Sequence, residues 1–296
     1  MVRALVLVNR HSRQGRQSAD LAVEYLRDLG IDVLEKRPAE AETLADLVRK
    51  HRDEVHMVIV GGGDGSLNAV AESLVETQLP LGVLPLGTAN DLARTLAIPS
   101  DLKSACNVIV SGRPRRIDLG WVNGRYFFNV ASVGLTVQIT RQLSKESKSR
   151  WGVFAYLITA ARVLWHARPF HAEIRCDGES IHVSTIQIAV GNGRHYGGGM
   201  VVAEDAAIDD ARLDLYSLEV EHWWQVLLLF PSLRQGTAGR SERVRTLQGR
   251  EFEIHLGKQR SLTADGEITT KTPASFRLCP NVLTVIVPDE NAAEAE

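Results

Sequence analysis

Two short glycine-bearing segments hold the residues of this sequence best suited to chemistry. Gly61-Gly62-Gly63-Asp64-Gly65-Ser66 follows the apolar run 55–60, and Pro85-Leu86-Gly87-Thr88-Ala89-Asn90-Asp91 follows the apolar run 81–84. Both predict a strand, a tight loop and the start of a helix. Glycine lets the backbone approach a ligand closely, and N–H groups at helix starts attract anions. The pair therefore predicts one phosphate-binding site at a sheet edge.

The carboxylate of Asp64 lies inside the first of these loops, where it would repel a phosphate unless a Mg²⁺ ion lay between them. A magnesium–nucleotide site accounts for both the glycines and the acid. The alternative interpretation is a tight strand-to-helix turn in which Asp64 caps the helix that begins near Leu67.

Phosphoryl transfer to a hydroxyl also needs a base that removes the hydroxyl proton. Asp265 and Glu267 flank Gly266 in an otherwise strand-like region and are the candidates. The sequence does not choose between the two acids. An Asp-Gly hairpin turn with a solvated glutamate is the structural alternative.

The predicted elements change character near Gly120. Before it, strands over 3–8, 31–34, 55–60 and 81–84 alternate with helices, which predicts a parallel sheet covered on both faces. Ligands of such sheets bind beyond the carboxyl ends of the strands. After it, the predicted strands are 125–131, 168–176, 181–190, 213–218, 251–255 and 275–278. Asp177-Gly178 predicts a hairpin turn, and apolar helices are predicted over 151–165 and from His222.

Composition excludes several classes of protein. The chain has 296 residues, 44% of them hydrophobic, with 34 Lys and Arg against 36 Asp and Glu. A net charge of −2 argues against a dedicated nucleic-acid binder. Cys106, Cys176 and Cys279 match no disulfide or metal spacing, so we expect buried thiols in a reducing compartment.

We find no signal segment and no long uncharged run, which predicts a cytoplasmic protein. Peripheral association with the inner face of the membrane stays open, and so does a homodimer. The segment with Lys145, Lys148 and Arg150 next to Trp151 would suit anionic headgroups or simply be a solvated helix start. His222-Trp223-Trp224 and the residues after it fit either core or the lining of an acyl-chain pocket.

The two glycine segments together resemble the diacylglycerol kinase catalytic-domain family, specifically the soluble bacterial lipid kinases of the YegS type. The first segment alone is also similar to NAD kinases and phosphofructokinases; Gly-Thr-Ala-Asn-Asp favours the lipid kinases. The resemblance implies an α/β plus mainly-β fold: an N-terminal doubly wound, NAD kinase/phosphofructokinase-like parallel-sheet domain (1–120, with 281–296 returning) and a C-terminal β-sandwich-like domain (121–280). It places the active site in the interdomain cleft.

By the same resemblance, the chain uses ATP and Mg²⁺ to phosphorylate a hydroxyl of a lipid such as diacylglycerol or phosphatidylglycerol, with a carboxylate of Asp265-Gly266-Glu267 as general base. The lipid substrate would be met at a membrane surface, and no nucleic acid is expected as a partner. A small-molecule kinase resembling NAD kinase, or a non-catalytic nucleotide- or lipid-binding protein, is the alternative.

The loop after the first strand resembles the family's nucleotide loop, Asn-Pro-x-Ser-Gly-x-Gly. Arg10 and Arg13 replace its proline and its first glycine, and their guanidinium groups either contact phosphates or are solvated. The nucleotide-binding residues implied by the resemblance are Asn9, Ser12, Arg13, Gly61, Gly62, Gly63, Asp64, Gly65, Ser66, Leu67, Gly87, Thr88, Asn90 and Asp91.

Two metal sites are implied in the same way. Asp64, Asp91 and Asp118 resemble the family's aspartate–water–magnesium network, although Asp91 could be a helix cap and Asp118 a salt-bridged strand end. A structural Mg²⁺ would take the Asp210 carboxylate and the carbonyls of Ala207 and Arg212. Ala211 replaces the family's glycine there, which would strain the loop if a positive φ is needed. Asn192 to Gly199 resembles a wall of the acceptor site.

Overall fold

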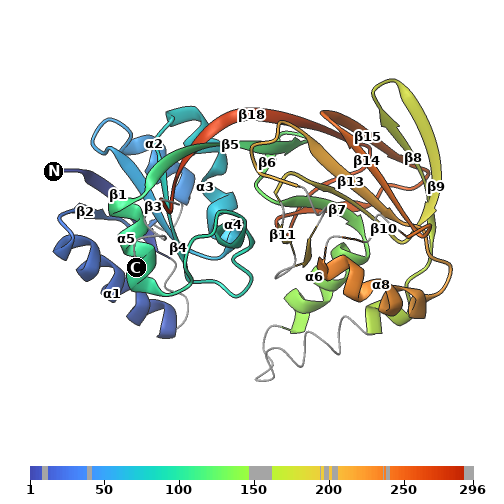
Figure 1. Cartoon of the computed structure of the whole chain (residues 1–296), viewed down its shortest axis with the longest axis horizontal. Helices are drawn as coiled ribbons and strands as arrows, with labels where there is room; N and C mark the ends of the chain where they lie inside the picture. Colours follow the sequence, from blue (N-terminus) through green and yellow to red (C-terminus); the bar gives the residue numbers. More distant parts are fainter. Residues whose placement is uncertain are drawn as a thin grey trace. The chain divides into compact units, whose positions relative to one another are not determined.

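The computed structural model describes residues 1–8, 13–38, 42–146, 162–193, 195–196, 200–201, 206–235, 237 and 241–289. These residues form two compact units, Met1–Leu119 with Cys279–Glu296 and Gly120–Leu278 (Figure 1). The fold is an α/β unit joined to a mainly-β unit, as the sequence predicts. No helix among the described residues is long and apolar enough to cross a membrane.

The α/β unit is built on a parallel sheet with the strand order β2-β1-β3-β4. Its central strands are buried because helices cover the sheet. The strands are β1 (Arg3–Val8), β2 (Asp32–Glu35), β3 (Met57–Gly62) and β4 (Leu81–Pro85).

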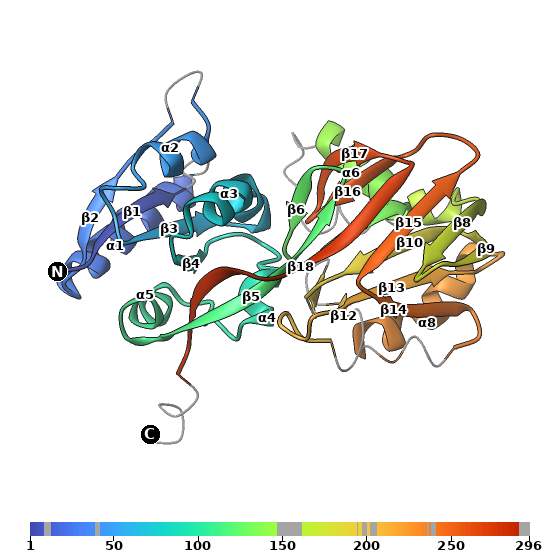
Figure 2. The same cartoon turned by 90° about the horizontal axis from the view of Figure 1, so that it is seen from above.

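Helices lie on both faces of this sheet (Figure 2). α2 (Leu44–Lys50) packs beside α3 (Asp64–Thr77), and α1 (Arg13–Asp28) packs beside α5 (Leu102–Ser111). The short α4 (Asp91–Thr95) follows the second glycine loop. Helix α2 begins at Leu44, because Thr43 and Asp46 form a capping box that fixes its start.

The mainly-β unit is a sandwich. One layer is an antiparallel sheet with the strand order β14-β13-β10-β7-β16-β17. The other layer has the order β18-β15-β8-β9. Inward residues of both layers form one core that includes Phe127, Phe252 and Phe276. The bounds are β7 (Val130–Gly134), β8 (Phe170–Cys176), β9 (Glu179–Thr185), β10 (Gln187–Gly191), β13 (Leu213–Leu218), β14 (Val244–Gly249), β15 (Glu251–Leu256), β16 (Ser261–Ala264), β17 (Glu267–Lys271) and β18 (Ala274–Val287).

The outer face of the six-stranded sheet carries a second apolar cluster. Ala189 and Tyr216 face it, whereas their neighbours Ile188, Val190 and Leu215 face the sandwich core, which is the period-two alternation of strands. Helix α8 (Trp223–Gln235) and residues 162–165 cover this outer cluster. Helix α6 (Leu135–Glu146) follows β7, and the small β11 (His195–Tyr196) and β12 (Met200–Val201) pair with each other.

Two strands run across the division between the units. β5 (Arg113–Val122) pairs with β6 (Arg125–Phe127) through residues 120–122. β18 was expected as two separate runs but is continuous: Ala274 to Arg277 pair with β15, and Val285 pairs with Leu81 of β4.

Two other strand predictions were wrong. The run 125–131 is broken into β6 and β7 by a turn at Phe128 and Asn129. The run 181–190 is divided between β9 and β10, which belong to different layers. Strands β14, β16 and β17 were missed. The Asp177-Gly178 hairpin turn was right: it joins β8 to β9 with positive φ at both residues. Of the helix predicted over 151–165, only 162–165 lies within the described residues.

Candidate functional site

The two glycine loops of the α/β unit touch each other through their backbones. A Cβ atom added to Gly87 would lie 2.4 Å from the Cα atom of Gly63. The N–H of Leu86 also donates to the carbonyl of Gly62 at 3.0 Å. No side chain fits at position 87 without separating the loops, so glycine there permits the close approach.

Asn90 closes the second loop on itself. It adopts a left-handed φ of 51°. Its Oδ1 accepts from the N–H of Gly87 at 2.9 Å, and its Nδ2 donates to the carbonyls of Gly87 and Pro85 at 3.0 and 3.2 Å. The asparagine side chain therefore holds Gly87 and the exposed Thr88 in shape.

Asp64 links the two loops. It opens α3, after the N-cap residue Gly63, and its Oδ1 accepts from the N–H of Leu92 at 3.1 Å. Leu92 lies in the first turn of α4, whose own N-cap, Asn90, makes no side-chain cap bond. Asp64 is thus a cap, as the alternative interpretation held, but for the helix after the other loop.

The remaining residues of the first loop divide between strand and helix. Gly61 and Gly62 are the last residues of β3 and are buried in the ladder with Leu84 and Pro85. Gly65, Ser66 and the buried Leu67 form the first turn of α3. Its helical hydrogen bonds begin with the N–H groups of Ser66 and Leu67, which donate to the carbonyl of Gly63. The backbone at this turn fits an anion.

Asp91 and Asp118 are both buried. Asp91 opens α4. Asp118 accepts from the N–H of Asn281 at 2.7 Å, while the Nε of Arg116 donates to the Asn281 carbonyl at 2.8 Å. Asp118 therefore fastens the returning strand β18 in the α/β unit. A place for Asp91 and Asp118 in a metal network stays a prediction.

Asn9 and Ser12 lie outside the described residues, as does Arg10. Arg13 is described only as the first residue of α1. Lys145, whose side chain is not described, is the second-last residue of α6; Lys148, Arg150 and Trp151 are outside the described range.

In the mainly-β unit, Asp265 is bound by three backbone N–H groups. Its Oδ2 accepts from Phe128 at 2.8 Å, and its Oδ1 accepts from Asn129 at 2.9 Å and Val130 at 3.2 Å. Its own N–H donates to the carbonyl of Val130 at 2.9 Å. These donors belong to the turn that separates β6 from β7. The break in the predicted strand 125–131 thus forms the cradle for this carboxylate.

Glu267 has the opposite environment. It opens β17 opposite Ala264, and its side chain is exposed. The two acids of Asp265-Gly266-Glu267 therefore differ in kind: the first is held by the protein backbone, and the second faces solvent.

Two asparagines lie near Asp265: Asn192 opens the segment expected as a wall of the acceptor site, whereas Asn129 was not predicted as a site residue. The carbonyl of Asn129 accepts from the N–H of Asn192 at 2.8 Å, and Nδ2 of Asn192 donates to the Phe128 carbonyl at 2.8 Å. Asn129 is 2% exposed, and its Oδ1 has no hydrogen-bond partner among the described residues. The signal was the polar residue that interrupts the apolar run Phe127-Phe128-Asn129-Val130. Within the segment Asn192 to Gly199, His195 lies in β11.

The loop expected to hold a structural Mg²⁺ is closed by protein groups. Asp210 accepts from the N–H groups of Ala207 at 3.0 Å and Arg212 at 3.2 Å, and Nε of Arg212 lies 3.2 Å from its Oδ2. The same Nε lies 3.7 Å from Asp214. Ala211 has a positive φ of 59°, which is the strained conformation expected if an alanine replaces glycine at this position. Because Oδ2 already faces an N–H and a guanidinium, this carboxylate fits a metal poorly, and the site stays a prediction.

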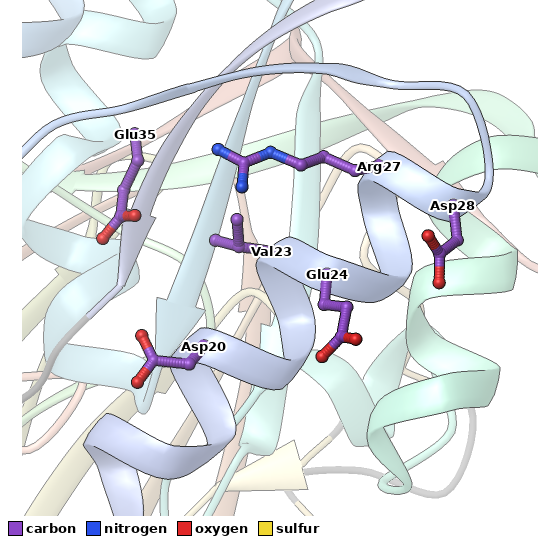
Figure 3. A pocket seen from close by; sticks show the side chains of 6 residues that line it. All are labelled: Asp20, Val23, Glu24, Arg27, Asp28 and Glu35. Carbon is purple, nitrogen blue, oxygen red and sulfur yellow. The ribbon is translucent and has the colours of Figure 1, made fainter.

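Among the described residues, no group of three or more His, Cys, Asp or Glu side chains could hold a metal ion. A surface hollow of about 390 Å³ lies between α1 and β2 (Figure 3). Its lining is mostly acidic, so it would repel a triphosphate, and it contains none of the expected site residues. The lining is Asp20, Val23, Glu24, Arg27, Asp28 and Glu35.

Comparisons with known proteins agree with this architecture. Residues 3–122 match the profile described as the diacylglycerol kinase catalytic domain, and residues 129–287 match that of the YegS C-terminal NAD kinase beta sandwich-like domain. A solved structure from Bacillus anthracis str. Sterne, described as that of a proposed diacylglycerol kinase, has the same fold. It superposes with a TM-score of 0.79 at 22% identity, over 98% of each chain.

Proteins that are similar in sequence are named as lipid kinases or diacylglycerol kinases. The chain is 34% identical to the "Probable lipid kinase YegS-like" of Klebsiella pneumoniae (strain 342) over 277 residues, 91% of each chain. It is 28% identical to the "Diacylglycerol kinase" of Bacillus subtilis (strain 168), over 82% of this chain and 81% of that one. The matched profile and these relatives define a kinase that acts on hydroxyl acceptors. The chain belongs to the diacylglycerol kinase catalytic-domain family, in its YegS-type lipid kinase branch.

Proposed function

We propose that this lipid kinase transfers the γ-phosphoryl group of ATP to a hydroxyl of a membrane lipid such as diacylglycerol or phosphatidylglycerol, with Mg²⁺ assistance and with Glu267 as the general base. The observation that carries the proposal is the backbone contact between the loops at Gly63 and Gly87. It supports a single cradle in which main-chain groups of both loops bind the phosphates.

The loops supply binding and orientation. The first turn of α3 offers N–H groups and the positive end of a helix dipole to the phosphates. Asn90 keeps Gly87 in the conformation that leaves room for the ligand. Rigid placement of the phosphates lowers the entropy lost on reaching the transition state.

Asp64 would hold Mg²⁺ together with the nucleotide. Its Oδ1 accepts from Leu92, and among the described residues its Oδ2 has no such bond. Magnesium bound mainly by phosphates needs only one or two carboxylates from the protein, and this donor set fits. When bound, the ion neutralises charge that develops on the phosphoryl oxygens.

The choice of Glu267 over Asp265 rests on their surroundings. Asp265 is engaged by three N–H groups, which commits both oxygens to the turn at 128–130. Glu267 is exposed at the start of β17 and can meet a hydroxyl. We assign Asp265 to positioning: it orders the turn beside the base.

Incubation with ATP, Mg²⁺ and a panel of lipids, followed by mass spectrometry, tests the proposal. We expect one lipid alcohol to gain a phosphoryl group. Glu267→Gln should lower kcat by about a hundredfold or more with ATP affinity unchanged. Glu251→Gln, which removes an exposed glutamate at the start of β15, is the matched control. Phosphorylation of NAD without lipid, or an active Glu267→Gln variant, would contradict the proposal.

A further inference from the structure

Helix α8 has an apolar side chain on both of its faces. Val226 and Leu229 are buried against the outer face of the six-stranded sheet. Trp224 and Leu228, one turn apart on the helix, are 45% and 63% exposed. The segment was predicted to be core or an acyl-chain pocket; the first face is core, and the second is open to solvent.

A second exposed tryptophan extends this surface. Trp165 is 62% exposed, and its ring lies 4.6 Å from the ring of Trp223 at the start of α8, with 35° between the planes. The exposed side chains of Trp165, Trp224 and Leu228 together are called the tryptophan face below. Within the described part of the chain, no tryptophan outside this face is exposed.

The chain around these side chains is basic. Residues 162–168 contribute Arg162 and Arg168, and the segment just before α8 contributes Glu221; all three side chains are exposed. Two arginines against one glutamate complement anionic headgroups. Exposed His166 and His222 flank the tryptophans, and the His222 ring stacks beside Trp224 at 6.1 Å.

We propose that the tryptophan face is the surface by which the enzyme docks on a bilayer with anionic headgroups. Tryptophan is the side chain that accumulates at the boundary between headgroups and acyl chains, because its ring is apolar and its N–H is polar. A helix that buries one face in the protein and shows Trp and Leu on the other, beside basic residues, binds in the plane of such a boundary. The proposal rests on the proposed function, since a lipid acceptor must be reached at a membrane.

Co-sedimentation with vesicles tests docking without catalysis. The full chain is mixed with phosphatidylcholine vesicles that carry phosphatidylserine as the anionic lipid, with no ATP and no acceptor. We expect binding, a blue shift of the tryptophan fluorescence, and an about tenfold weaker partition for Trp224→Ala/Leu228→Gln. Val110→Gln, at a 40% exposed apolar residue in α5, is the matched control and should bind as the wild type does. If the double variant melts at a lower temperature than the wild type, the vesicle binding of the single variant Leu228→Gln is compared with that of the wild type instead.

Three results would overturn the docking surface. The first is equal vesicle binding by the wild type and the variants, and the second is no vesicle binding by the wild type. The third is a change of molar mass between wild type and Leu228→Gln in light scattering without vesicles, which would make the face a contact between copies of the chain. Vesicle binding that the variants lose, in a protein that phosphorylates no lipid, would uphold docking and reject the proposed function. Phosphorylation of a lipid by a protein whose variants bind vesicles as well as the wild type does would uphold the proposed function and reject the docking surface.

Discussion

The carboxylate of Asp64 accepts a hydrogen bond from the N–H of Leu92 at 3.1 Å, so a residue of one glycine loop caps the helix that follows the other. The bond makes the shape of the second loop depend on the first. This structural role needs only an acceptor oxygen, whereas the proposed binding of Mg²⁺ by Asp64 needs its negative charge.

Two substitutions separate these tasks. Asp64→Ala removes both and should lower the free energy of unfolding by about 1 kcal/mol, the usual cost of a lost cap. Asp64→Asn keeps an acceptor oxygen and should restore most of that stability, yet remain poorly active because the charge is absent. Urea unfolding and an ATP turnover assay measure the two effects. Equal activity of Asp64→Asn and wild type would remove the metal role.

Gly87→Ala should separate the loops. The added Cβ would lie 2.4 Å from the Cα of Gly63, so one backbone must move. We expect a loss of about 1–3 kcal/mol of stability and a clearly weaker binding of ATP, measured by calorimetry. Gly257→Ala is the control, since nothing lies within 4 Å of its added Cβ. Unchanged ATP affinity in Gly87→Ala would show that the contact is not part of the cradle.

Substitutions at Asp265 and Glu267 should have different effects on the stability of the protein. Asp265→Ala leaves three N–H groups of the turn at 128–130 without their acceptor, and we expect a loss of about 1–3 kcal/mol. Glu267→Gln is a surface change and should alter stability by no more than about 0.5 kcal/mol. Chemical denaturation of both variants provides the comparison. A stable Asp265→Ala protein would contradict the positioning role.

Arg212 should stabilise the loop that was expected to bind a structural Mg²⁺. Its guanidinium lies near both Asp210 and Asp214, so Arg212→Ala should lower stability by about 1 kcal/mol at low salt. Wild-type melting should be the same in EDTA and in Mg²⁺. Arg175→Ala, which breaks an exposed pair with Glu173, is the control. A rise of the wild-type melting temperature with Mg²⁺ would instead support the metal.

Cys106 should resist thiol reagents. Burial raises the pKa of its thiol to about 11, helped by the nearby charge of Asp101. Because the folded state keeps the proton to higher pH, this thiol opposes folding only in alkali: the stability present below the ordinary value of 9.0 is lost as pH rises through about 11. Ellman titration at pH 8 should modify half-buried Cys176 or Cys279 first, and Cys106 only in denaturant. Equally fast modification of Cys106 would contradict its burial.

Local pattern was enough to predict most of the α/β unit, because strands β1 to β4 and the helices between them are each specified by a contiguous run of the sequence. The two glycine loops belong to this class. The mainly-β unit was harder to predict because its strands pair with strands far away in the sequence. Asp265 is held by a turn more than a hundred residues earlier in the chain. Strands β9 and β10 are almost consecutive in the sequence but belong to different layers. Cysteine burial was likewise only partly right, since Cys176 and Cys279 are half-buried.

Strand β18 is one uninterrupted strand that pairs with a strand of each unit. Near its start, Phe276 pairs with β15 of the mainly-β unit, and near its end, Val285 pairs with β4 of the α/β unit. During synthesis on a ribosome, the α/β unit therefore cannot be completed until residues 279–287 have emerged, long after its first strand. Until then the edge of β4 is open to pairing with another chain. Premature release of the nascent protein would expose that edge, so chaperone demand should concentrate in this interval.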